Sequence, residues 1–372
     1  MFGGILRGPL DVVSAGNEEG TMAFEVDFLG VGRGERSADA IALRITDATA
    51  PTGQRVMVID GGTQDSGEEL VAHVQSYYGT KYVDYVVLTH PDADHASGLT
   101  VVLDKLSVGT LVMHKPWEHA NEIRSMFFND RIPISRLEGK LERALQNAKD
   151  LEVIANRKRI PIVEPFAGVG NASGSFLVLG PTEQYYQSLI CDFRSTPQAK
   201  ESPMLQALRA AAEKGLEWVS ETLQFETLTD GGVTSAENNS SAIILVSDGQ
   251  NRLLFTGDAG IPALLQATGF ADSSGNAVTG LKCLQVPHHG SRRNLGPSVL
   301  DRLSGTDKAF VSCCKDGAPK HPSQRVINAL VRRRAEVFTT CGKSIRWADG
   351  FPARDGWTAA AVPRQFVGSF QE

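Results

Sequence analysis

The sequence predicts an α/β fold, and three observations support this prediction. Short apolar runs that end at glycine or polar residues alternate with amphipathic helical stretches, as is typical of α/β domains. Near the N-terminus a strand, a helix and a second strand follow one another, which suggests a crossover unit. Histidines and carboxylates gather directly after the apolar runs, where the carboxyl ends of strands are expected.

Length and charge limit the classes of protein that the chain can be. Its 372 residues are 41% hydrophobic, so it can bury a large core, and we expect one large domain over residues 1–372. The formal net charge of −6 offers no global positive field for nucleic acid. This argues against a simple nucleic-acid-binding module, although a metal-dependent nuclease would neutralise phosphate locally.

The cysteines and the hydrophobic runs predict where the protein resides. Five cysteines without a CxxC pair indicate neither a disulfide framework nor a zinc knuckle, and Cys313 and Cys314 are expected to be buried thiols. No secretory signal is visible at Met1–Arg7, and no run is long enough to span a membrane. We therefore expect a cytoplasmic protein without a membrane partner.

The first 115 residues predict strands punctuated by glycine and one crossover helix. Glu68 to Tyr78 has helical spacing, and it lies between two strand-like runs. The expected strands of this region are Thr21 to Val31, Ala40 to Ile45, Val56 to Ile59 and Tyr85 to Leu88.

Residues 117–230 differ in character and predict a mainly helical insertion or lid within the domain. Ile134 to Asn156 and Pro203 to Lys214 are charged and amphipathic, while Ile160 to Val163 and Ser175 to Leu179 resemble strands. Because no Pro/Ser-rich linker isolates this region, we expect it to be attached to the core.

After Gly231-Gly232 the strand pattern returns. Ser241 to Val246 and Arg252 to Phe255 are joined by a turn-rich segment that is typical of a hairpin. Helices are expected at Gly260 to Thr268 and Ser323 to Arg334, and strands at Leu281 to Val286, Lys308 to Ser312 and Glu336 to Thr339.

The most informative stretch is His90-Pro91-Asp92-Ala93-Asp94-His95, directly after an apolar run. Two carboxylates this close repel each other unless a cation or a proton intervenes, so the stretch indicates a divalent metal site. The alternative is a solvated loop in which Asp92 and Asp94 cap the next helix. Further candidate ligands follow other strands, namely Asp60, Asp258 and the pair His288 and His289. For Asp258 alone, a helix N-cap is the competing interpretation.

The order of these motifs resembles the metallo-β-lactamase-fold hydrolases, whose signature is HxHxDH followed by distant ligands. Within that superfamily the chain is most similar to the hydrolase domain of competence DNA-uptake channel proteins. The motifs that carry the resemblance are Phe28-Leu29-Gly30-Val31-Gly32-Arg33-Gly34, Val58-Ile59-Asp60-Gly61-Gly62, His90 to His95, Asn238-Asn239-Ser240-Ser241, Leu254-Phe255-Thr256-Gly257-Asp258, Val286-Pro287-His288-His289-Gly290-Ser291 and His321-Pro322. The resemblance implies a four-layer αβ/βα sandwich.

The resemblance also implies a centre of two divalent metal ions. His90 and Asp92 would hold one ion, and Asp94, His95 and His288 the other, with Asp258 bridging the two. Asp94 would in addition orient a hydroxide that bridges the ions. Asp92 stands where most superfamily members have histidine, and the chain has Glu237-Asn238-Asn239 where a further histidine is usual. These departures make manganese, or magnesium, a candidate beside zinc.

Other residues are candidates for contact with the substrate. His289 is expected to point away from His288 on an extended backbone, and either protonates a leaving oxygen or fixes the loop. His321 is expected to act on the substrate or as an acid. Weaker substrate candidates are Asn239, Arg292, Arg293 and Lys320. We interpret His73, His114 and His119 as structural or surface residues.

Three functions are compatible with these features. The first is a metal-dependent phosphodiesterase, above all a nuclease, whose partner is nucleic acid or another phosphodiester. The second is a small-molecule hydrolase that opens a lactone, a thioester or a cyclic nucleotide under a lid. The third is a partner-regulated effector of a multiprotein defence-type system, with residues 117–230 as its docking surface.

Overall fold

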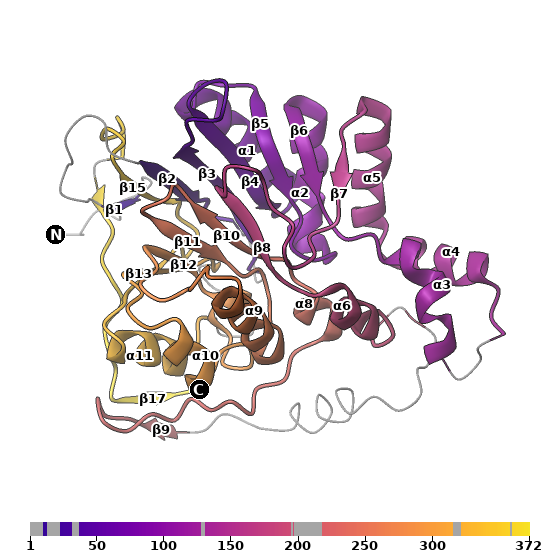
Figure 1. The fold of residues 1–372 in the computed structure, drawn as a ribbon. Helices are drawn as coiled ribbons and strands as arrows, with labels where there is room; N and C mark the ends of the chain where they lie inside the picture. The colour runs from indigo at the N-terminus through magenta and orange to yellow at the C-terminus, as the bar shows by residue number, and fades with distance from the viewer. Residues whose placement is uncertain are drawn as a thin grey trace.

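The computed structural model describes residues 10–12, 23–31, 37–127, 131–194, 196, 218–314, 321–357 and 359–372. Two large β-sheets lie face to face, and helices cover the outer face of each, which gives four layers (Figure 1). The expected α/β sandwich is therefore confirmed. The Pro203 to Lys214 helix and Lys320 lie outside the described residues.

The first sheet has nine strands in the order β16-β1-β15-β2-β3-β4-β5-β6-β7. Its centre is antiparallel from β15 to β4, whereas β4 to β7 run parallel to one another. The strands are β1 (Leu10–Val12), β2 (Phe24–Phe28), β3 (Ala40–Thr46), β4 (Gln54–Gly61), β5 (Tyr82–Val87), β6 (Ser107–Val112), β7 (Ile162–Val163), β15 (Ile345–Asp349) and β16 (Ala359–Ala360).

The second sheet has six strands in the order β14-β13-β12-β11-β10-β8. β10 and β11 form the expected hairpin, and β11 to β14 run parallel. The strands are β8 (Phe176–Gly180), β10 (Ile243–Ser247), β11 (Arg252–Phe255), β12 (Cys283–Gln285), β13 (Lys308–Val311) and β14 (Glu336–Thr339). A separate pair is formed by β9 (Trp218–Ser220) and β17 (Ser369–Gln371).

Helices lie on the outer faces of both sheets (Figure 1). Those packed with the first sheet are α1 (Gln64–Tyr77), α2 (Ala93–Lys105), α3 (Ala120–Ile123), α4 (Ile134–Ala144), α5 (Gln146–Lys158) and α6 (Glu183–Ile190). Those packed with the second sheet are α9 (Ile261–Ser273), α10 (Pro297–Arg302) and α11 (Gln324–Arg332). Short turns of helix are η1 (Pro116–His119), η2 (Arg124–Met126), α8 (Ala236–Asn239) and η3 (Pro287–Gly290).

Three hydrophobic clusters hold these layers together. One lies between the first sheet and its helices, a second between the second sheet and its helices, and a third between the two sheets. In the third cluster Phe28 of β2 stacks on Phe310 of β13, with ring centroids 4.8 Å apart. Burial of apolar side chains on both faces of the sheets explains why strands such as β10 are almost continuously apolar. Cys313 and Cys314 are buried thiols, as expected.

The segment 117–230 contributes to both sheets. β7 pairs with β6 in the first sheet, and β8 pairs with β10 in the second. α5 packs against α2, and its Leu151 and Ala155 belong to the first core. A lid role for residues 117–230 stays a prediction.

Candidate metal centre

The predicted ligands meet at one edge of the sandwich, where strands of both sheets end. Asp60 is the second-last residue of β4, and His90 follows β5. Both strands belong to the first sheet. Asp258 follows β11 and the histidine pair follows β12, both in the second sheet. Residues that are far apart in the sequence therefore face one another across the gap between the two sheets.

Asp60 is buried and organises the first sheet's side of the site. Its Oδ1 accepts a hydrogen bond from the Thr89 backbone N–H at 2.8 Å, and its Oδ2 accepts one from the Thr89 hydroxyl at 2.7 Å. Oδ2 also lies 2.7 Å from His95 Nδ1. A carboxylate can only accept here, so His95 donates its Nδ1 proton and leaves Nε2 as a lone pair. Asp60 holds a φ of +56°, an uncommon conformation that clusters at functional sites.

His90, His95, His288 and His289 are all held through Nδ1. In each of them Nδ1 contacts an oxygen of the surrounding protein, so Nε2 is the nitrogen left for a ligand role. Because the Thr89 hydroxyl donates to Asp60, it accepts from His90. The Nδ1 contacts are His90 to Thr89 Oγ1 at 3.2 Å, His95 to Asp60 Oδ2 at 2.7 Å, His288 to Asn294 Oδ1 at 2.8 Å and His289 to the Ser312 carbonyl at 3.0 Å.

The Asp258 carboxylate lies among three of these Nε2 atoms. Its oxygens are 3.8 Å from His90, 3.7 Å from His95 and 3.6 Å from His288. These separations are too long for hydrogen bonds, and they leave room for an ion between the groups. Within the described part of the chain, His90 Nε2, His95 Nε2 and Asp258 Oδ1 are buried without a hydrogen-bond partner. Unsatisfied buried polar atoms are costly, and a bound cation would satisfy all three.

Asp39, His95, Asp258 and His289 form the most compact group. One ligand atom of each lies within 4.8 Å of the others, and all four residues are buried. Gln285 Nε2 donates to Asp39 Oδ2 at 3.2 Å, whereas Asp39 Oδ1 has no partner among the described residues. Two imidazoles and two carboxylates are a donor set that suits zinc, manganese or iron. The residues present therefore fit a divalent ion.

The buried carboxylates of the cluster favour a bound cation. Burial raises the pKa of Asp39 to about 7, although the nearby His95 opposes this shift. Burial also raises the pKa of Asp258, and the charges of Asp94 and Asp60 raise it further. Burial alone would lower the pKa of His95, but Asp60 and Asp258 raise that pKa well above its usual value. Buried carboxylates this close are stabilised when a divalent ion lies between them.

The two remaining carboxylates of the signature differ in their surroundings. Asp94 lies in the first turn of α2, and its charge acts on Asp258, Asp92 and His95. Asp92 occupies the N-cap position of α2 without capping it. Its carboxylate instead contacts Arg194, whose Nη2 lies 2.9 Å from Oδ2 and 3.2 Å from Oδ1.

The backbone of the histidine pair is not extended, which corrects our expectation. His288 and His289 have φ values of +48° and +54°, in the left-handed region. The pair still separates: His288 is the more exposed and contacts Asn294, while His289 is buried beside Asp39. The contacts of His289 favour a ligand role over a proton donor that must reach the substrate.

The substrate candidates lie around this cluster to different degrees. His321 is near His288, with ring centroids 5.7 Å apart, and burial lowers the pKa of His321 to about 4, assisted by the charges of His288 and Arg293. Asn239 is buried and donates to the Ser235 carbonyl at 3.1 Å. Arg292 contacts the Glu372 carboxylate at 3.3 Å, so it is already paired.

The three histidines interpreted as structural make contacts away from the cluster. His73 Nε2 lies 3.0 Å from Asp27 Oδ2, and His119 Nε2 lies 3.2 Å from Glu164 Oε1. His114 is buried and stacks on Tyr186, with ring centroids 4.0 Å apart.

Two residues of the site escaped the sequence analysis, namely Asp39 and Arg194. Asp39 precedes β3 instead of following a strand. The antiparallel pairing of β3 with β4 places Ala40 opposite Gly61 and so brings Asp39 to the ligand edge. No short sequence pattern signals this position, because it depends on the pairing of β3 with β4. Arg194 reaches Asp92 across 102 residues of sequence, and no local pattern marks it.

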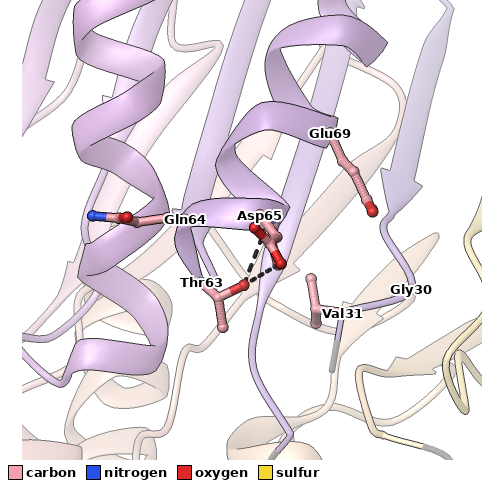
Figure 2. Close-up of a pocket in the computed structure, with 7 residues that line it drawn as sticks. Gly30, Val31, Thr63, Gln64, Asp65 and Glu69 are labelled. Carbon is pink, nitrogen blue, oxygen red and sulfur yellow. Dashed lines mark hydrogen bonds between the residues drawn. The ribbon is translucent and has the colours of Figure 1, made fainter. Parts of the chain in front are cut away.

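A pocket of about 300 Å³ opens beside the start of α1, apart from the metal cluster (Figure 2). Thr63 caps α1 there by accepting from the Ser66 N–H. None of the residues that line the pocket is a candidate metal ligand. The lining residues are Gly30, Val31, Thr63, Gln64, Asp65, Ser66 and Glu69. Asp65 and Glu69 make this wall acidic, so it is a poor place for a phosphate.

Comparison with known proteins agrees with this geometry. Residues 43–182 match the family model of the metallo-beta-lactamase superfamily. Residues 43–182 therefore belong to a domain of the metallo-β-lactamase type. The matched segment includes β4, β5 and the histidine–aspartate signature, so the resemblance drawn from the motifs is confirmed. Members of this superfamily are hydrolases.

The chain is also similar to a curated protein and to solved structures. Recombination protein 2 of Haemophilus influenzae, a competence-related protein, is 32% identical over 133 residues, which cover 36% of this chain and 16% of that protein. A long-form RNase Z from yeast has a TM-score of 0.37 at 10% identity, covering 86% of this chain and 41% of the other. A diphosphatase of the PhnP family has a TM-score of 0.36 at 11% identity, covering 93% and 98%. In the described part of the chain no helix has the length and apolarity to cross a bilayer.

Proposed function

We propose that this metallo-β-lactamase domain is a metal-dependent phosphodiesterase whose substrate is nucleic acid. The observation that carries the proposal is the convergence of unpaired Nε2 atoms on the Asp258 carboxylate, with Asp39 and His289 completing a buried donor set. When bound there, a divalent ion supplies Lewis acidity toward a phosphoryl oxygen and lowers the pKa of water. Zinc and manganese suit these donors, and magnesium is a further candidate.

The chain's own residues support the chemistry in separate roles. Asp60 fixes the orientation of His95, and Asn294 fixes that of His288. We assign to Asp94, in the first turn of α2, the acceptance of a proton from an attacking water. We assign to His321, beside His288 and near Arg293, the donation of a proton to the leaving oxygen. A phosphate next to His321 would favour its protonated form.

Nucleic acid is proposed as the substrate for two reasons. The similarity to Recombination protein 2 concerns a protein whose name refers to recombination, and the carboxylate-rich donor set favours the harder ions that accompany phosphate. Arg293 lies four residues beyond His289, and its positive charge acts on His321, so it is our candidate for contact with a backbone phosphate. The match covers 16% of that relative, so its full activity is not transferred.

A substrate panel tests the proposal. Protein loaded with manganese, magnesium or zinc should cleave single- or double-stranded DNA, RNA or a bis-aryl phosphate, and Asp258→Asn and Asp94→Ala should each lose at least about 100-fold in rate. Asp65→Asn, at the exposed start of α1, is the matched control and should retain full activity.

Two other outcomes would replace the proposal. Hydrolysis of a lactone, a thioester or a cyclic nucleotide without cleavage of any polymer would identify a small-molecule hydrolase. Absence of activity toward every phosphodiester with all three metals would refute the phosphodiesterase. Regulation by a protein partner through residues 117–230 stays a prediction.

A further inference from the structure

Arg194 brings a positive charge to the edge where the candidate metal ligands lie. It belongs to the segment after α6, in which no metal ligand is predicted. It follows α6 and reaches back to the start of α2, where its Nη2 contacts both oxygens of Asp92. Its Nε lies 3.1 Å from Glu237 Oε1, and its backbone N–H donates to the same oxygen at 2.7 Å. One guanidinium thus connects two acidic residues from different elements.

The two carboxylates explain why a cation is needed at this position. Glu237 is only 3% exposed, and its Oε2 has no hydrogen-bond partner in the described part of the chain. Asp92 and Glu237 contact the same guanidinium, so two carboxylates share this one cation. A buried carboxylate without a counter-charge is strongly destabilising, and arginine satisfies carboxylates with several donors at once.

The same contacts compete with a metal ion. Arg194 contacts both oxygens of Asp92 and places a full positive charge beside them, and this charge repels a second cation at the same carboxylate. Asp92 is also absent from the compact donor group of Asp39, His95, Asp258 and His289. A guanidinium carries one positive charge and cannot be deprotonated in proteins. It can therefore stand permanently where the sequence resemblance implies an ion.

We propose that Arg194 replaces the ion expected between His90 and Asp92, so that the domain binds one divalent ion tightly and uses Arg194 as its second positive charge. The side chain is 67% exposed, so the guanidinium still faces solvent and has donors for an incoming anion. Its ligand is a phosphate oxygen of the substrate, since planar arginine donors match phosphate geometry. This last part rests on the proposed phosphodiesterase function.

Metal stoichiometry tests the proposal without any assay of activity. The full chain, saturated with Mn²⁺ and freed of excess metal, should retain one ion per molecule by elemental analysis and give the spectrum of isolated Mn²⁺ in electron paramagnetic resonance. Arg194→Ala frees Asp92 and Glu237 and should retain close to two ions, with the signature of a coupled pair. Arg194→Lys should stay near one ion, and so should Arg157→Ala, a control in which an exposed arginine loses its partner Asp104.

A second variant keeps the test valid if Arg194→Ala fails to fold. Asp92→Asn removes the charge without removing the arginine. If Arg194 occupies this position, Asp92→Asn retains its one ion with an unchanged Mn²⁺ dissociation constant. Two tightly held ions in the unmodified protein, or loss of an ion in Asp92→Asn, would overturn the proposal.

The phosphate role has its own readout. Inorganic phosphate should bind the Mn²⁺-loaded protein about 10-fold or more weakly after Arg194→Ala, and Arg194→Lys should recover part of that loss. If phosphate binding is unchanged in Arg194→Ala, the phosphate contact is wrong. If instead stoichiometry and phosphate binding behave as expected but no phosphodiester is cleaved, the proposed function fails and the assignment of Arg194 as the second cation stands.

Discussion

At the scale of single residues, the site is organised by the groups that hold its histidines. All four histidines give their Nδ1 proton to an oxygen of the protein, and each therefore presents Nε2. The ligand atoms are fixed in direction before any ion arrives, which lowers the cost of ordering them on binding. Asp60 has the largest share in this, because it receives three hydrogen bonds from Thr89 and His95.

We expect Asp60→Asn to weaken metal binding while the fold is kept. An amide offers one acceptor oxygen, so its NH₂ group must face either the Thr89 backbone N–H or His95 Nδ1. In the second case His95 turns its protonated nitrogen toward the ion. The dissociation constant for Mn²⁺ or Zn²⁺, measured by competition with a chelating dye, should rise about 10- to 100-fold. Asp65→Asn makes the same chemical change on exposed α1 and should bind as the unmodified protein does.

His114 provides a pH dependence that is separate from the metal site. Burial lowers the pKa of His114 to about 3, and neither ring nitrogen has a hydrogen-bond partner among the described residues. In the unfolded chain its pKa is about 6.5. Below that pH, His114 therefore binds a proton in the unfolded state and stays neutral in the folded state. Its contribution to stability is therefore present above pH 6.5 and is lost as pH falls toward 3.

His114→Phe should remove this slope while keeping the stacking on Tyr186. Between pH 6 and pH 4 the free energy of unfolding of the unmodified protein should fall, relative to the variant, by up to about 1.4 kcal/mol per pH unit. Urea denaturation at several pH values measures both proteins in the same buffers. Parallel pH profiles would show that His114 is protonated in the folded protein.

Residue-scale prediction from sequence succeeded where the chemistry is local. His90, His95 and Asp258 stand directly after apolar strands, so the sequence marks them as candidate ligands, and the fold brings them together. Asp39 and Arg194 could not be found in this way. Asp39 reaches the site through antiparallel pairing, and Arg194 through packing of a distant segment. Only the topology, which no short pattern contains, places them.

At the scale of elements, the tightest junction is the crossing of α1, α2 and β4 behind the metal edge. A Cβ atom added to Gly98 of α2 would lie 1.9 Å from the Gly61 carbonyl oxygen and 2.4 Å from that of Thr63. The Gly98 N–H also donates to the Gly62 carbonyl at 3.0 Å. α2 carries Asp94 and His95, so this close approach sets how deeply the signature enters the site.

We expect Gly98→Ala to lower the free energy of unfolding by about 3 kcal/mol or more, because backbone atoms must move to admit the methyl group. Gly269 is the matched control, since it lies inside α9 with open space around its Cβ position. Gly269→Ala should instead raise stability by about 0.5–1 kcal/mol through helix propensity. Urea midpoints of the two variants give the comparison, and similar midpoints would contradict the role of the crossing.

Prediction of elements worked best where a turn bounds a short strand. β11 and β14 have the bounds that the sequence predicts. The stretch Ile134 to Asn156, expected to be continuously helical, is two helices that break at Leu145. Leu145 is buried, so the break is set by packing into the core and leaves the helical periodicity almost undisturbed. β7 and β8 lie within residues 117–230, the segment predicted to be an insertion, and each extends a sheet.

At the scale of the whole molecule, the candidate metal centre lies where the two sheets meet, beside polar contacts such as the one from Gln285 to Asp39. The sheets meet through one shared cluster in which Phe28 stacks on Phe310 and Tyr85 on Phe176. The candidate ligands lie at the end of this interface, with Asp39 and His95 on the first sheet and Asp258 and His289 on the second. An ion bound by all four therefore links both sheets, and unfolding of either half must release it.

Metal binding should consequently stabilise the entire fold by mass action. An ion present at 100 times its dissociation constant adds about 2.7 kcal/mol if it binds only the folded state. Thermal unfolding of chelator-treated protein, followed with rising Mn²⁺ or Zn²⁺, should show a midpoint that increases with the logarithm of metal concentration. Asp258→Asn removes a ligand from the second sheet and should abolish most of this increase, whereas Asp65→Asn should retain it. If the midpoint of the unmodified protein does not change with metal concentration, Asp39, His95, Asp258 and His289 do not share an ion. An ion ligated from both sheets must raise the stability of the fold.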